Sequence, residues 1–380
     1  TEDILCKSVI ATTLTAAEAA AEGLEGSLAD TLDRLPLEAL EAAYEQAVPE
    51  GSSLKESVLS LARGETTLDG AALLSALARR LLSALSGSVW RFARLIAPAV
   101  FCGVAGKIRA SFAGRSVGEA AQSACFLLLA GFMTQDLSAH AALAQENIRR
   151  MADLMQSLFP LLLTLLAAVG GTASAAFFQP TVVAACGTMT EVIRTLTLPL
   201  ALGAAGVTLL NHLTEKIRLG RLAALLKTGA TWTLGVSFTV FLSVTTLQSL
   251  GTAAADGVSI RTAKYAVDNF VPIVGGMFAD TMDTLVGASL LIKNALGITG
   301  LTLLIATACA PMLETLAAVM IYRACAALLE PVSDGAVVAC LQDFSDILML
   351  LFVIQLSVGA MFLLLVAQML VVGNLTVMLR

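Results

Sequence analysis

The stretch of sequence from Asp256 to Gly300 is largely apolar, yet six charged side chains follow Asp256 within it. Charged groups are costly beside hydrocarbon, so within a membrane they usually face protein, water or a cavity. Asp280 and Asp283 are three residues apart and share one helix face, where paired carboxylates could bind a cation or a proton. The alternative is that the two carboxylates only form a polar face at the membrane edge. The six residues are Arg261, Lys264, Asp268, Asp280, Asp283 and Lys293.

The same stretch contains residues that interrupt helices. Pro272 lacks a backbone N–H, and the pair Gly275–Gly276 follows it closely. A similar set occurs earlier in the chain, at Pro160 and at Gly170–Gly171. We predict helix breaks at these positions, which a membrane tolerates only where neighbouring groups satisfy the freed backbone. The glycine pairs also suit close helix packing, and that interpretation stays open beside the approach of a ligand.

The sequence contains none of the motifs that mark a catalytic or nucleotide-binding site. There is no G-x-S-x-G, no Walker A motif and no H-E-x-x-H. The two histidines, His140 and His212, argue against a histidine-based metal site. The seven cysteines form no C-x-x-C pair and are interpreted as buried thiols. We therefore predict that the protein is not an enzyme and needs no cofactor or metal.

Composition points to a membrane protein. Hydrophobic residues make up 57% of the chain, charged residues 14%, and the mean hydropathy is +0.84. Soluble domains have roughly 25% charged residues. From about Ile96 onward, the apolar residues come in continuous runs long enough to cross a bilayer. The predicted fold class is all-α, a polytopic helical membrane protein in contact with the lipid bilayer. No basic patch of the kind that binds nucleic acid is present.

Two regions follow from the distribution of apolar residues. Residues 1–86 are rich in Ala, Leu and Glu and are predicted as a small helical extramembrane region whose last helix lies on the membrane surface. A partly disordered leader is the alternative. Residues 87–380 form the predicted membrane domain. Its expected spans are Leu95–Gly106, Gly118–Leu137, Met151–Val169, Thr172–Thr190, Leu196–Leu210, Thr231–Leu250, Asn269–Gly287, Ala288–Ala306, Met312–Leu329 and Ile347–Val372.

An internal repeat is indicated by residues that recur 112 positions apart. We predict a duplication of repeat-like units at about 118–212 and 231–330, followed by the final span at 347–372. Duplicated broken helices are typical of a transporter-like core. The matched pairs are Ile148 and Ile260, Arg149 and Arg261, Pro160 and Pro272, and Pro199 and Pro311.

Basic residues suggest an orientation. They cluster in Lys107–Arg115 and Lys216–Lys227, so both segments are expected on the cytoplasmic side. The second segment is interpreted as an amphipathic interfacial helix or a basic loop. The acidic leader, and loops that hold the two Ile-Arg pairs, are then expected outside. That placement agrees with a cleaved export signal (a signal peptide) before Thr1.

Three segments carry a resemblance to a known family. They are Gly170–Pro180 (GGTASAAFFQP), Asp256–Gly300, and Gly373–Arg380 (GNLTVMLR). Together with their order and the chain length, they resemble stage III sporulation protein AE of endospore-forming bacteria. The resemblance covers roughly Met151 to Arg380 and is weak in the first 110 residues.

The resemblance implies a function that composition alone does not reach. It implies a non-enzymatic component of the secretion-like channel between mother cell and forespore, located in the mother-cell membrane around the forespore. The implied partners are other proteins of the same stage III sporulation operon, including a cytosolic ATPase and ring-forming proteins, and the forespore protein Q. The family supplies no catalytic residues. From the residues themselves, two alternatives remain: a small-solute permease with a site at the broken repeat helices, or a structural membrane anchor.

Overall fold

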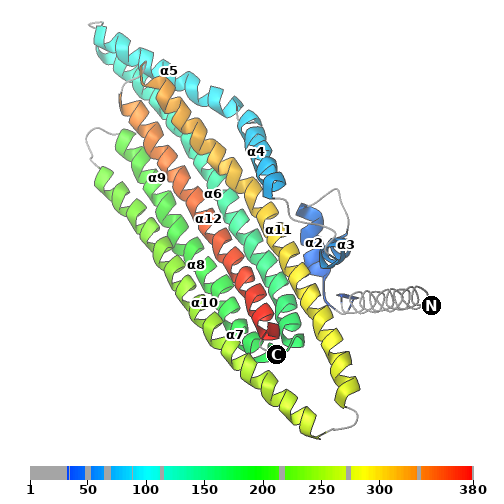
Figure 1. The fold of residues 1–380 in the computed structure, drawn as a ribbon. Coiled ribbons are helices and arrows are strands. Elements are labelled where there is room, and N and C mark those ends of the chain that lie inside the picture. The colour runs from blue at the N-terminus through cyan, green and yellow to red at the C-terminus, as the bar shows by residue number, and fades with distance from the viewer. Residues whose placement is uncertain are drawn as a thin grey trace, which may run out of the picture.

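Five long helical rods run side by side in the computed structural model (Figure 1). It describes residues 32–33, 35–47, 53–63, 70–87, 89–111, 115–213, 219–270, 275–331 and 335–378. Within these ranges some stretches are described by their backbone alone, the longest being 105–111, 115–122, 249–270 and 275–285. The described residues contain no strand, and each rod includes a segment that is long and apolar enough to cross a membrane. The prediction of an all-α, multi-pass membrane protein is confirmed.

The rods are α6, the stack from α7 to α9, α10, α11 and α12. Two short π-helical segments, η1 and η2, join α7, α8 and α9 into one rod. The bounds are α2 Glu38–Ala47, α3 Leu54–Ala62, α4 Gly70–Gly87, α5 Val89–Ser111, α6 Arg115–Ala168, α7 Thr172–Val183, η1 Ala184–Met189, α8 Thr190–Val192, η2 Ile193–Thr197, α9 Leu198–Leu213, α10 Gly220–Phe270, α11 Gly275–Leu329 and α12 Gly335–Met378.

Helix α12 lies at the centre of the bundle. It packs against α6, α9, α10 and α11 (Figure 1). Its sequence is apolar around most of its circumference, as expected of a helix surrounded by others. Leu348, Leu351 and Ile354 are completely buried. Successive rods alternate in direction along the chain (Figure 1).

Glycines on α11 allow the neighbouring helices to approach closely. A Cβ added at Gly297 would overlap the side chain of Leu370 on α12, and one added at Gly300 would overlap Leu158 on α6. Lipid provides no hydrophobic drive between membrane helices, so close packing at small residues is a main source of their association. Gly297 and Gly300 therefore help to fix α11 between α6 and α12.

The expected spans at 118–137 and 151–169 are wrong as separate elements, because both lie in the continuous helix α6. The polar stretch between them remains helical. Glu146 pairs with Arg150 at 2.9 Å, and Arg149 pairs with Asp153 at 3.4 Å, each one turn along the exposed face. Ile148 is buried on the opposite face. The Ile148–Arg149 pair is thus part of a helix and not of a loop.

Spans expected in the second half of the bundle are also wrong as separate elements. The spans expected at 269–287, 288–306 and 312–329 fall, from Gly275 onward, within the single helix α11. The pair Ile260–Arg261 lies within α10, again not in a loop. The interfacial segment expected at Leu213–Lys227 is not separate either, because residues 220–227 are the first turns of α10. A continuous helix satisfies the backbone hydrogen-bonding groups in both water and lipid, so a polar stretch alone does not end the helix.

The turn between α6 and α7 is set by two glycines. Gly170 has φ 102°, a left-handed conformation that costs a residue with a Cβ about 1–2 kcal/mol. The N–H of Gly170 donates to the carbonyl of Ala167 at 3.0 Å, and that of Gly171 donates to Leu166 at 2.9 Å. These two bonds form a Schellman motif, which satisfies the last carbonyls of α6.

Pro160 is not a helix break, which corrects the prediction made for it. The residue lies inside α6, with helix on both sides. Transmembrane helices tolerate an internal proline because neighbouring helices and local adjustments satisfy the freed carbonyl. Pro272 falls in 271–274, outside the described residues, and Gly275 begins α11. The duplication itself stays a prediction: each expected unit contains an antiparallel pair of long helical rods, and Pro272, the expected counterpart of Pro160, lies outside the described residues.

The long helices exceed the thickness of a bilayer. Helices α6, α10, α11 and α12 have 54, 51, 55 and 44 residues. At 1.5 Å per residue, these lengths are about 65–80 Å, against about 30 Å of hydrocarbon. Each of the four helices therefore extends beyond the hydrocarbon layer on at least one side.

The described part of residues 1–86 is helical and packs on the bundle. Helix α3 begins with a capping box in which Ser53 and Glu56 bond each other's backbone N–H groups. Asp33 accepts a hydrogen bond from Lys55 at 2.9 Å, which raises the pKa of the Lys55 ammonium. Helices α2 and α3 contact α11, and α4 packs along α11 and α5 (Figure 1). The position of residues 1–86 relative to a membrane, and the domain boundary at residue 86, stay predictions.

Candidate functional site: buried polar clusters between the helices

Most residues singled out from the sequence lie where the structure gives no side chains. The side chains of Arg261, Lys264, Asp268, Asp280 and Asp283 are outside the described residues, so their roles stay predictions. Lys293 is the one member of that set with a described side chain, and it belongs to the interface between α11 and α12.

Lys293 is buried against the backbone of α12. Only 1% of the residue is exposed, and its ammonium donates to the carbonyl of Leu370 at 3.3 Å. The absence of a Cβ at Gly373 makes room for it, since an added Cβ would overlap the ammonium. No ion pair to Lys293 occurs within the described part of the chain. A buried ammonium with a backbone acceptor and no carboxylate is a costly arrangement, which indicates a specific role.

A second cluster joins α5, α6 and α11. Arg94 on α5 forms a 3.0 Å ion pair with Asp136 on α6. The hydroxyl of Tyr322 on α11 donates to the other oxygen of Asp136, also at 3.0 Å. The Arg94 guanidinium also lies 5.1 Å from the ring centre of Phe132. Both oxygens of a nearly buried carboxylate are thereby satisfied, so Asp136 holds three helices in register.

A related contact lies one helical turn further along α6. Arg91 on α5 donates to Glu314 on α11 at 3.0 Å and to Nε2 of His140 at 3.3 Å. His140 is 3% exposed. A cavity of about 360 Å³ opens at this point, with Arg91, Arg94, Asp136, His140 and Glu314 among the residues that line it. The basic and acidic groups together form a compact, nearly balanced ionic cluster between the helices.

A neutral network crosses the centre of the bundle. Asn147 on α6 donates to the side-chain oxygen of Gln355 on α12 at 2.8 Å. Gln355 in turn donates to the hydroxyl of Thr315 on α11 at 3.2 Å. All three side chains are buried. Polar side chains that bond one another across apolar interfaces specify which helix faces meet.

A separate ionic cluster ties four helices together near the α10 and α12 N-termini. His212 on α9 contacts Asp343 on α12 at 2.9 Å. Lys227 on α10 and Arg323 on α11 both pair with Asp346 on α12, at 2.9 and 3.5 Å. These pairs are partly exposed, so each contributes modestly to stability. Their common element is again α12, which carries both carboxylates.

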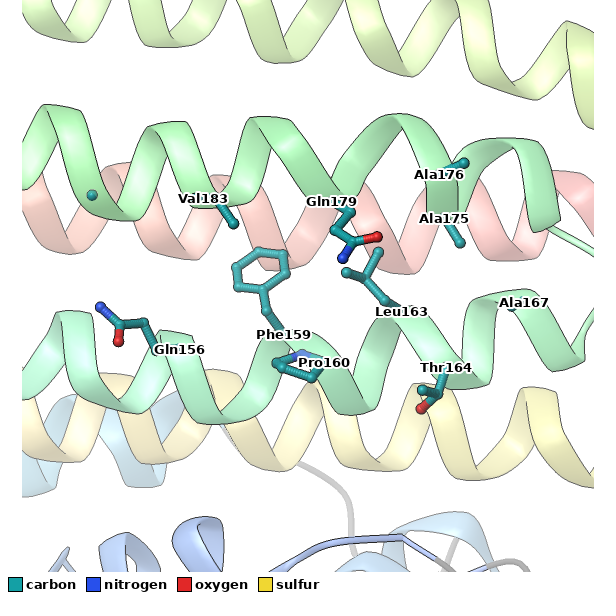
Figure 2. A pocket seen from close by; sticks show the side chains of 11 residues that line it. Gln156, Phe159, Pro160, Leu163, Thr164, Ala167, Ala175, Ala176, Gln179 and Val183 are labelled. Carbon is teal, nitrogen blue, oxygen red and sulfur yellow. The ribbon is translucent and has the colours of Figure 1, made fainter.

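An apolar groove lies between α6 and α7. It has a volume of about 710 Å³, and Figure 2 shows Phe159 and Leu163 of α6 directed toward Gln179 and Val183 of α7. Pro160 lines the same groove. A second hollow continues along η1 and α8 as far as Glu191 and Thr195. The walls offer few polar groups, so the groove suits an apolar occupant such as a lipid chain or a helix.

These polar and ionic groups connect helices to one another. The charged side chains of the clusters described above pair with one another or with backbone, and no group of three or more His, Cys, Asp or Glu residues within the described part of the chain could hold a metal. Sequence reasoning missed Asp136, His140 and Glu314, although a signal existed. Each is an ionisable residue within an otherwise apolar run, the same criterion that selected Lys293.

Comparison with known proteins gives two matches. The family model for stage III sporulation protein AE matches residues 52–373. Stage III sporulation protein AE of Bacillus subtilis (strain 168) is 33% identical over 337 residues, which cover 89% of this chain and 84% of the relative. No solved structure matches the chain. The family match covers most of the chain, including every cluster described above, and the chain therefore belongs to the stage III sporulation protein AE family.

Proposed function

We propose that this protein is a non-enzymatic membrane component of the secretion-like channel complex that connects mother cell and forespore during endospore development. It would act in the mother-cell membrane that surrounds the forespore. Membership of a stage III sporulation family, over residues 52–373, carries the proposal. That membership ties the chain to sporulation, and the channel role is our extension of it.

The shape of the bundle supports a role in an assembly. Helices of about 65–80 Å project beyond a hydrocarbon layer of about 30 Å, so they offer surface outside the membrane to soluble partners. The charged face of α6, with Glu146, Arg149, Arg150 and Asp153, is unsuited to lipid contact. Such surfaces are the expected contacts for the cytosolic ATPase and the ring-forming proteins of the same operon, and for forespore protein Q.

The described chemistry supports a component without catalytic activity. Its paired ionisable groups link helices: the nearly buried Asp136 joins α5, α6 and α11, and the partly exposed Asp346 joins α10, α11 and α12. Paired charges of this kind keep helices in fixed relative positions. A rigid bundle of this type suits a scaffold around which other subunits assemble.

Co-purification from sporulating cells tests the proposal. The chain would carry an affinity tag, and membranes from sporulating cells would be cross-linked, solubilised in detergent and purified on the tag. We expect mass spectrometry to recover the ATPase and the ring-forming proteins in amounts comparable to the tagged chain. An abundant multi-pass protein of the same membrane, tagged in the same way, serves as the control.

Recovery of the tagged chain alone, at normal abundance, would contradict the channel role. A flux assay with the purified chain in liposomes addresses the permease alternative. The proposal expects no solute flux from the chain alone, whereas a permease would transport its solute without partners.

A further inference from the structure

Two adjoining cavities lie between α4, α5, α6 and α11. The inner cavity, of about 360 Å³, contains the ionic cluster around His140. The outer cavity, of about 440 Å³, is lined by Arg80, Ser83, Ala84 and Gly87 of α4, with Arg91, Ala310, Leu313 and Glu314. Arg91 and Glu314 line both cavities, so their ion pair lies at the junction. We refer to the two cavities together as the arginine crevice.

Two hydrogen-bond donors at the inner cavity have no acceptor bonded to them. An arginine N–H can only donate, so Nε2 of His140 must accept the bond from Arg91. The hydrogen of the neutral ring is then on Nδ1, and this buried atom has no partner among the described residues. The Nε–H of Arg94 is likewise buried and unpartnered there. Both residues line the cavity, so the group that would satisfy them is an acceptor.

The outer cavity adds a further donor. Arg80 lines it and forms no ion pair within the described part of the chain. Its neighbour Arg79 differs, because the Arg79 guanidinium bonds to Ser75 of its own helix. Glu314 is the single acidic residue of the outer cavity and is engaged by Arg91. The free positive charge at the entrance is therefore that of Arg80.

We propose that the arginine crevice binds a phosphate-class anion, held by Arg80 at the entrance and reached by the unpartnered donors of His140 and Arg94 inside. Arginine guanidinium groups match phosphate oxygens in geometry and charge. A metal cation would meet arginines in place of free carboxylates, since Asp136 and Glu314 are both already paired. The phosphate could belong to an acidic lipid headgroup or be free in solution.

Binding measurements on the full-length chain in detergent test this proposal. After delipidation, thermal unfolding would be followed against increasing inorganic phosphate, and separately against short-chain phosphatidylglycerol, with sodium chloride and short-chain phosphatidylcholine as controls. We expect saturable stabilisation by at least one probe. Saturation by phosphatidylglycerol alone identifies a headgroup, whereas saturation by inorganic phosphate identifies a soluble anion.

Two adjacent arginines provide a matched pair of variants. Arg80→Gln should weaken the apparent affinity about tenfold, since hydrogen bonds to charged groups are among the stronger ones. Arg79→Gln makes the same change of charge one residue away and should leave the affinity unchanged. His140→Ala should also weaken binding. If that variant does not fold, the comparison of Arg80→Gln with Arg79→Gln still tests the proposal. The proposal is overturned if neither probe saturates, or if Arg80→Gln and Arg79→Gln bind alike.

Discussion

Lys293 and Gly373 show what a sequence reveals at the scale of single residues. A lysine in an apolar run is conspicuous, so Lys293 could be selected without a structure. Its dependence on Gly373, 80 positions away, could not, because only the packing of α11 on α12 brings them together. The pairings of Asp136 and Glu314 could not be predicted from the sequence for a related reason. Each partner of these carboxylates lies on another helix, so no local spacing indicates the pairs.

Gly373→Ala should destabilise the protein by about 1–3 kcal/mol, because the new methyl group displaces the Lys293 ammonium from its place beside Leu370. Thermal melting in detergent measures the effect. Gly359→Ala on the same helix is the control, since the nearest atom to its added Cβ, the sulfur of Met151, is at an ordinary 3.6 Å. Equal melting temperatures for the two variants would show that Gly373 does not accommodate the lysine.

Asp280 and Asp283 remain candidates from the sequence. If they line a polar path or bind a partner, replacing both with Asn should abolish spore formation while the protein stays inserted and abundant, because Asn keeps the size but removes the charge. Spore counts and membrane immunoblots measure the two quantities. Leu291→Ala, at a partly exposed position of the same helix, is the control. Normal sporulation of the double variant would show that the two residues only form a solubilising polar face.

At the scale of helices, hydropathy predicted helix type well and helix number poorly. By hydropathy alone, polar residues between two apolar runs, as between 137 and 151, indicate two separate spans. In α6 the intervening polar residues have good helix propensity, and their charged side chains form ion pairs along the exposed face, so the helix continues. The break at Gly170–Gly171 was predictable, because two adjacent glycines supply the left-handed residue that ends a helix.

The Asn147–Gln355 bond should be worth about 1 kcal/mol, the usual size of an interhelical hydrogen bond in a membrane protein. A double-mutant cycle with Asn147→Leu and Gln355→Leu, read by thermal or denaturant unfolding, isolates this energy. Each single variant leaves a buried polar group without its hydrogen-bond partner. The double variant should therefore be destabilised by less than the sum of the two single destabilisations. Strict additivity would show that the two amides do not interact energetically.

At the scale of the whole molecule, five antiparallel rods place alternate turns at opposite ends of the bundle (Figure 1). The sequence predicted membrane class and a helical N-terminal region. It could not give the central position of α12, which depends on contacts with four other rods. The basic segments expected in the cytoplasm flank the N-terminal ends of α6 and α10, which lie at the same end of the bundle (Figure 1).

Cysteine labelling tests this topology. In a variant without the native cysteines, Gly220→Cys and Glu330→Cys should react with an impermeant reagent from the same side of the membrane, because both lie at one end of the bundle. Thr172→Cys, at the other end, should react only from the opposite side. Labelling of all three from one side would contradict the crossing pattern.

A deletion in the spore-forming organism that encodes the chain tests the central claim most directly, namely that this bundle is a membrane component required for endospore development. Heat-resistant spores would be counted with and without the gene, and after restoring a wild-type copy. We predict normal vegetative growth, loss of heat-resistant spores in the deletion, and recovery with the restored copy. A normal yield of heat-resistant spores from cells that lack the chain would contradict the account.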